Sequence, residues 1–129
     1  KKYLGIIKSE KELIKIYKKS DIFVMPSLAE SFGQVFIEAG SLGLPCVAFT
    51  DTGASEIIIH KKNGYLANYK SAKDLAKGIY WSKNIVENKN TRRNIRRLVI
   101  KNFSSKSRIN DYIKLYKKAY KNFDDKKID

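Results

Sequence analysis

DIFVMPSLAESFGQVFIEAGSLGLPCVAF, residues 21–49, contains two short apolar runs separated by a more polar, helix-like segment. The first run spans residues 22–25 and stops at Pro26, and the second spans residues 46–49. Continuous apolar runs of this length are typical of strands buried on both faces, as in parallel sheets. The stretch therefore predicts two buried strands.

The segment between these runs predicts an α-helix from about Phe32 to Leu42. Gly43 follows it and Pro45 comes two residues later, which is the usual order of helix-stop signals. A strand, a helix and a second strand in this order favour a parallel sheet.

The flanking sequence extends the same alternation. Ser9 and Glu12 form a capping box before a helix, and Ser71 with Asp74 forms a second capping pair. The other predicted elements are a strand end at residues 3–7, a short helix at 56–58, a strand at 65–67, and helices at 91–101 and 105–120. We therefore expect an α/β fold, a Rossmann-like parallel sheet flanked by helices with a helical C-terminal tail, within a single domain of residues 1–129.

Composition limits the function classes. Hydrophobic residues make up 43% of the 129 residues, which excludes disorder as the default, and no apolar run is long enough to span a bilayer. The single cysteine, Cys46, excludes an internal disulfide and favours a cytoplasmic location. The net charge of +14 predicts an anionic partner, such as nucleic acid, an acidic membrane surface or a phosphorylated small molecule.

Parallel sheets bind ligands beyond the carboxyl ends of their strands, which directs attention to loops 5–9, 26–33 and 50–55. The second loop contains Glu30, and Glu38 follows on the predicted helix. Eight residues at about 100° each place the two carboxylates within about 80° of each other. Carboxylates accept hydrogen bonds from sugar hydroxyls, and a helix start offers unpaired amides, here those of Ser31, Phe32, Gly33 and Gln34. Taken alone, Glu30 also suits a helix-dipole role and Glu38 a solvated helix surface.

The surrounding residues resemble the donor-binding motif of glycosyltransferase family 4, within the GT-B superfamily. The matching residues are Pro26, Ser27, Glu30, Phe32, Gly33, Glu38 and Ala39. The resemblance continues downstream through residues 43–48, Gly53, Glu56 and residues 63–66, and upstream through Leu4, Gly5, Glu12, Leu13, Tyr17 and Asp21.

The resemblance implies the C-terminal, donor-binding half of a retaining glycosyltransferase that moves a sugar from a UDP-sugar or GDP-sugar to a glycan or lipid-linked acceptor. Glu38 would accept from the ribose hydroxyls and Glu30, the catalytic candidate, would face the donor sugar. The phosphates and sugar hydroxyls would meet Ser31, Phe32, Gly33, Gln34 and Val35, and the loop at Gly5 would lie against the base. No cofactor and no metal are expected.

The resemblance further implies an N-terminal domain for the acceptor, and a diphosphate-clamping Arg and Lys, before the counterpart of Lys1. Since the chain opens on Lys1 rather than Met, we expect a partial domain that is inactive alone. Peripheral contact with the inner face of the membrane is a further expectation. Tyr112, Tyr116 and Tyr120 share one predicted helix face, which suggests a core stripe or a surface between domains.

Two other function classes stay open. A basic nucleic-acid-binding module would explain the charge, but the sequence has no recognition-helix, single-strand-binding or zinc signature, so nucleic acid is not the favoured partner. A non-transferase relative with a GT-B-like fold, such as a sugar-nucleotide epimerase, would use the same donor site.

Overall fold

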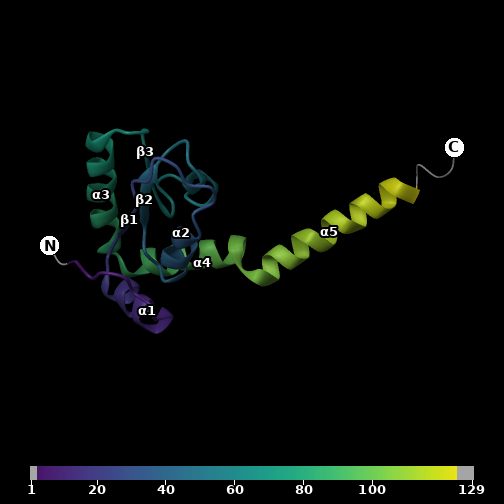
Figure 1. Ribbon diagram of the computed structural model, residues 1–129, viewed down its shortest axis with the longest axis horizontal. Helices are drawn as coiled ribbons and strands as arrows, with labels where there is room; N and C mark the ends of the chain where they lie inside the picture. Colours follow the sequence, from purple (N-terminus) through teal and green to yellow (C-terminus); the bar gives the residue numbers. More distant parts are fainter. Residues whose placement is uncertain (1–2, 125–129) are drawn as a thin grey trace. The chain divides into compact units, whose positions relative to one another are not determined.

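The computed structural model describes residues 3–124, without the side chains of residues 89, 110, 119 and 121–124 (Figure 1). The chain divides into two compact units, and the division falls between Val99 and Ile100. That boundary falls inside the helix α4, Lys89–Phe103. Whether the whole chain acts as one domain stays a prediction.

A parallel three-stranded sheet forms the centre of the first unit. Its strands are β1 (Phe23–Val24), β2 (Cys46–Phe49) and β3 (Gly64–Ala67), in the order β1-β2-β3. The helix α2, Gln34–Ser41, connects β1 to β2, and the 3-10 helix η1, Gly53–Glu56, lies between β2 and β3. The predicted α/β fold with a parallel sheet is therefore confirmed.

Helices cover both faces of the central strand β2. Cys46 lies towards α2, with its sulfur 3.7 Å from the Phe36 carbonyl oxygen. Val47 lies towards α3, Ala72–Val86, where a Cβ built on Gly78 would be 2.9 Å from the Val47 side chain. In Figure 1, α2 and α3 accordingly lie on opposite sides of the strands. All four β2 residues are buried, as the apolar run predicts.

The helix α1, Glu10–Lys19, packs on the α2 side through a row of aromatic rings. Tyr17 lies edge-on to Phe23 at 5.8 Å between ring centroids, and Phe23 lies edge-on to Phe36 at 5.6 Å. The predicted caps form as expected, because Ser9 Oγ accepts from the Glu12 amide and Ser71 Oγ from the Asp74 amide.

Three predicted boundaries are wrong. Residues 3–7 form no strand, because no described strand runs beside them, and Tyr3 and Ile6 lie almost fully in solvent. Strand β1 has two residues instead of four, with Phe23 half-buried and Val24 exposed, and it is an edge strand of the described sheet, paired with β2. The predicted helix at 56–58 is replaced by η1, which begins three residues earlier at Gly53.

The helix α4 closes the first unit through Ile95 and Val99, which are almost fully buried. Val99 packs against Gly40 of α2 so closely that a Cβ there would be 2.8 Å from its Cγ2 atom. The second unit contains the helix α5, Ser105–Asp124. None of the helices within residues 3–124 is both long and apolar enough to span a bilayer.

Candidate functional site

Two loops meet where β1 and β2 end. The Gly53 amide, in the loop after β2, donates a hydrogen bond of 2.7 Å to the Glu30 carbonyl oxygen in the loop after β1. A Cβ on Gly53 would lie 2.5 Å from the carbonyl carbon and oxygen of Ser31, so only glycine allows this approach. Adjacent parallel strands end at the same edge of a sheet, and this contact confirms that loops 26–33 and 50–55 meet there.

A tight turn at Gly33 sets the start of α2. Gly33 has φ 78° and ψ 51°, a left-handed conformation that residues with a side chain rarely adopt. Its amide donates to Glu30 Oε1 at 3.1 Å. A Cβ at Gly33 would lie 2.5 Å from the ring of Phe36, which is buried in the core. This turn explains why α2 begins at Gln34 and not near Phe32.

The start of α2 presents unpaired amides next to Glu30. The Phe36 amide bonds the Gly33 carbonyl oxygen at 2.9 Å, whereas the Gln34 and Val35 amides have no partner in the described part of the chain. Unpaired amides at a helix N-terminus, together with the helix dipole, suit an anion.

Glu38 lies further along α2, beside α1. The Tyr17 hydroxyl donates to Glu38 Oε2 at 3.3 Å. Both residues line a cavity of about 300 Å³ between the two helices, whose other lining residues are Glu10, Leu13, Ile14, Ser41 and Leu42. Burial, and then the neighbouring Glu38 carboxylate, raise the pKa of Tyr17 to about 12. Tyr17 therefore stays a hydrogen-bond donor at any physiological pH.

The two predicted carboxylates have different neighbours in the structure. Glu30 lies at the loop junction and is held by the Gly33 amide, whereas Glu38 lies in the α1–α2 cavity, which Glu30 does not line. Each has one carboxylate oxygen fixed by a protein donor and the other without a partner among the described residues. That both face one bound donor stays a prediction.

The other predicted site residues lie at three places. Ser31 and Phe32 are exposed in the loop that leads to Gly33, and Gln34 and Val35 open α2. Gly5 lies in the irregular segment before α1 with φ 66°, and no atom lies within 4 Å of a Cβ built on it. The structure thus brings the predicted residues of loop 26–33 together, and leaves the segment at Gly5 exposed to solvent.

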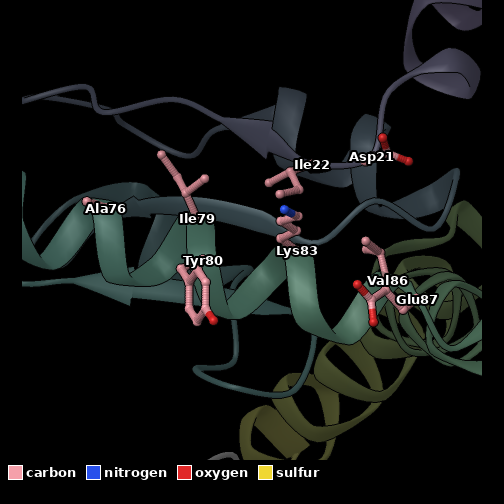
Figure 2. A pocket seen from close by; sticks show the side chains of 8 residues that line it. All are labelled: Asp21, Ile22, Ala76, Ile79, Tyr80, Lys83, Val86 and Glu87. Atoms are coloured by element: carbon pink, nitrogen blue, oxygen red, sulfur yellow. The ribbon is translucent and has the colours of Figure 1, made fainter.

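A larger cavity, of about 750 Å³, lies elsewhere in the first unit, along α3 (Figure 2). Figure 2 shows Ala76 at one end and Asp21 with Glu87 at the other, and mostly apolar side chains between them. Asp21 and Ile22 directly precede β1, so one end of this cavity lies beside the amino end of the strand, and Ala76 lines the other end. It contains none of the predicted site residues.

Two further residues contribute contacts that the sequence did not predict: Tyr17 bonds Glu38, and Gly53 packs on Ser31. Tyr17 precedes Glu38 by 21 positions, and its helical spacing with Leu13 indicates only an inward face. Gly53 belongs to a loop that the topology singled out, but its contact with Ser31 depends on tertiary structure. Among residues 3–124, no group of His, Cys, Asp and Glu side chains could hold a metal ion. The expectation of metal-free chemistry stays a prediction.

Comparison with known proteins identifies the family. The model of "Glycosyl transferases group 1" matches residues 2–102. A D-inositol 3-phosphate glycosyltransferase of Pseudarthrobacter chlorophenolicus is 42% identical over 65 residues, which are 50% of this chain and 16% of the relative. The capsular polysaccharide biosynthesis glycosyltransferase CapM of Staphylococcus aureus is 31% identical over 74 residues, 57% of this chain and 20% of CapM. The chain spans about a fifth of the length of the curated relatives that it matches.

A solved structure shares the fold. It is Anabaena Alr3699/HepE in complex with UDP and glucose, with a TM-score of 0.62 and 25% identity, covering 81% of this chain and 29% of that protein. The parallel sheet, the shared fold of the solved structure and the match to the family model point to the same family. This chain has a GT-B-type, Rossmann-like fold and belongs to the glycosyl transferases of group 1.

Proposed function

We propose that this chain is the donor-binding part of a retaining glycosyltransferase, and that it binds a UDP-sugar or GDP-sugar at the carboxyl edge of its sheet. Family membership supports transfer of a sugar. The related Anabaena protein was solved with UDP and glucose bound, which supports a nucleoside diphosphate as the group that leaves.

The observation that carries this proposal is the pair of unpaired amides at Gln34 and Val35. They directly follow Gly33, whose amide is bonded to the Glu30 carboxylate. In retaining transfer, the bond between sugar C1 and the diphosphate oxygen breaks, and the acceptor hydroxyl gives its proton to the leaving diphosphate while its oxygen joins C1 on the same face. The diphosphate leaves with the electron pair. Amide donors and the positive end of α2 would stabilise this developing negative charge.

The two glutamates would bind the two sugar rings of the donor, Glu30 the transferred sugar and Glu38 the ribose. Glu30 keeps Oε1 on the Gly33 amide, and its Oε2 would accept from a hydroxyl of the donor sugar. Glu38 keeps Oε2 on Tyr17, and its Oε1 would accept from the ribose. A carboxylate that is already fixed by one donor loses less conformational freedom when a ligand binds. Gly5 would provide a backbone surface for the base.

The acceptor is proposed to be a glycan or a lipid-linked glycan. The support is the similarity to CapM, which belongs to capsular polysaccharide biosynthesis. We further propose that an N-terminal domain binds the acceptor. The transfer is proposed to need no cofactor and no metal ion.

The proposal is tested by calorimetric titration of the 129-residue chain with UDP, GDP, ADP, UDP-glucose and GDP-mannose. We expect one uridine or guanosine nucleotide to bind and Glu38→Ala to weaken its binding by about tenfold or more, since a hydrogen bond to a charged group contributes about 1.5–3 kcal/mol. Glu87→Ala, at the exposed end of α3, removes the same charge and is the matched control. Equal affinities for wild type and Glu38→Ala would remove Glu38 from the site.

Two further measurements separate the alternatives, and the first uses the full-length protein because this chain is expected to be inactive alone. A sugar-nucleotide epimerase would convert UDP-glucose into another UDP-sugar without any acceptor, which chromatography of the nucleotides detects. A nucleic-acid-binding module would bind DNA or RNA with a steep salt dependence, and Glu38→Ala would not weaken that binding.

A further inference from the structure

A hydrogen bond joins the loop after β3 to the loop that contains Glu30. The Tyr69 hydroxyl donates to the Leu28 carbonyl oxygen at 3.1 Å, although the two residues are 41 positions apart in the sequence. The Tyr69 ring lies edge-on to Phe49, the last residue of β2, with 6.2 Å between the ring centroids. A side chain that follows the third strand therefore crosses the end of the second and reaches the loop after the first.

The loop around Glu30 depends on hydrogen bonds because packing does little to hold it. Four of the five residues in 28–32 are exposed, and Glu30 is half-buried. Three donors from other parts of the chain or from the turn hold this loop: the Tyr69 hydroxyl on the Leu28 carbonyl oxygen, the Gly53 amide on the Glu30 carbonyl oxygen, and the Gly33 amide on Glu30 Oε1. Tyr69 is the one side chain among these three donors.

The turn that presents Tyr69 is itself fixed. The Ser71 amide donates to the Asn68 carbonyl oxygen at 3.0 Å, and the Asn68 amide donates to Oδ2 of Asp74, in the first turn of α3, at 2.8 Å. Lys70 has a left-handed conformation with φ 60°, and its Nζ lies 5.1 Å from the centroid of the Tyr69 ring. A cation over an aromatic face is attracted to it, which limits the movement of the ring. The Tyr69 hydroxyl is thus held in place from its own side.

We propose that Tyr69 is a positioning residue for Glu30. It holds the Leu28 carbonyl oxygen, two residues before Glu30, and so keeps the carboxylate at the junction of loops 26–33 and 50–55 before a donor sugar arrives. A carboxylate that is positioned in advance loses less conformational freedom when the ligand binds. That Glu30 contacts the donor sugar rests on the proposed function, whereas the fixing of the loop by Tyr69 does not.

Amide hydrogen exchange of the 129-residue chain, followed by nuclear magnetic resonance, tests the positioning without any ligand. Tyr69→Phe removes the hydroxyl and keeps the aromatic ring. Because the loop then loses one of its three anchors, we expect the Gly33 and Gly53 amides to exchange about fivefold faster, the factor that one hydrogen bond contributes. The amides of β2 should keep the wild-type rate. The control Tyr80→Phe removes an exposed hydroxyl on α3 and should leave both glycine rates unchanged.

Calorimetric titration with two pairs of ligands, UDP with UDP-glucose and GDP with GDP-mannose, tests the consequence for the donor. In the proposed site Glu30 binds the sugar, and the Gln34 and Val35 amides of α2 bind the diphosphate. We therefore expect Tyr69→Phe to weaken binding of the sugar nucleotide by about fivefold and binding of the matching nucleoside diphosphate by less than about twofold. A purely structural loss would weaken both alike.

Three results would overturn the positioning role. They are unchanged exchange at Gly33 and Gly53 in Tyr69→Phe, equal weakening of the nucleotide and the sugar nucleotide, and faster exchange that extends uniformly into β2, which would indicate a loss of global stability. If no nucleotide binds to the wild type, the proposed donor site fails, and the exchange rates by themselves decide whether Tyr69 fixes the loop.

Discussion

The Tyr17 hydroxyl donates a hydrogen bond to Oε2 of Glu38 and so links α1 to α2 inside a cavity that both helices line. This contact holds the carboxylate in one position before any ligand arrives. Tyr17→Phe removes the donor and keeps the ring that packs on Phe23. We expect Tyr17→Phe to weaken nucleotide binding by about fivefold, since one hydrogen bond contributes about 1 kcal/mol, as measured by calorimetry.

The raised pKa of Tyr17, about 12 against 10 in an unfolded chain, makes this contact sensitive to high pH. A raised folded pKa contributes stability that is complete below pH 10 and is lost as the pH rises towards 12. We therefore expect the difference in unfolding free energy between wild type and Tyr17→Phe to shrink between pH 9 and pH 11. Urea unfolding at both pH values measures it, with the exposed Tyr112→Phe as control. A difference that is constant with pH would contradict the proposed role of burial and of Glu38.

Asn63 is a buried polar residue that holds the loop before β3. Its Nδ2 donates to the Ile57 carbonyl oxygen at 3.0 Å, and its Oδ1 accepts from the Ile59 amide at 2.6 Å. Asn63→Ala leaves both backbone groups unpaired and should lower the unfolding free energy by about 2–3 kcal/mol. Asn84→Ala, on the exposed face of α3, should change it by about 0.5 kcal/mol or less. Comparable losses in urea unfolding would show that the Asn63 contacts are not structural.

Gly33 and Gly5 both have positive φ values, and only Gly33 is enclosed. Gly5→Ala adds backbone strain alone and should lower the unfolding free energy by about 1 kcal/mol. Gly33→Ala also pushes a methyl group against the Phe36 ring, so we expect a loss of about 3 kcal/mol or more. Thermal or urea unfolding of the pair tests whether the turn before α2 is as tight as described. A smaller loss for Gly33→Ala than for Gly5→Ala would refute it.

Cys46 is buried in β2, and burial raises the pKa of its thiol to about 12. The reactive thiolate is therefore scarce at neutral pH. We expect no reaction with a disulfide reagent at pH 8 in the folded chain, and complete reaction after unfolding in guanidinium chloride. Rapid labelling of the folded chain at the unfolded rate would place Cys46 at the surface.

The sequence predicts local features of this fold better than long-range ones. The Ser9 and Ser71 caps and the buried strand β2 follow from a few neighbouring residues, and the structure confirms them. Residues 3–7 look equally strand-like, but a strand exists only beside a partner, which apolar spacing alone does not reveal. The two-residue length of β1 follows in the same way from its position at the edge of the described sheet.

The candidate site shows the same limit. Motif residues 30–35 are close in sequence, so their gathering at the start of α2 was predictable. The contacts that fix the carboxylates depend on packing between elements. Tyr17 meets Glu38 because α1 packs on α2, and Gly53 meets Glu30 because two loops converge after their strands. Helical spacing correctly indicates that Tyr17 faces inward, but it does not identify its partner.

The most direct test of the donor site is a nuclear magnetic resonance titration of the ¹⁵N-labelled chain with UDP. We expect the largest amide shifts at Gly33, Gln34 and Val35, with a second set at Gly53. We also expect Glu38→Ala to need a higher nucleotide concentration to reach the same shifts. Shifts confined to the α3 cavity around Ile79 and Tyr80, or no shifts with either UDP or GDP at millimolar concentration, would contradict the proposed donor site.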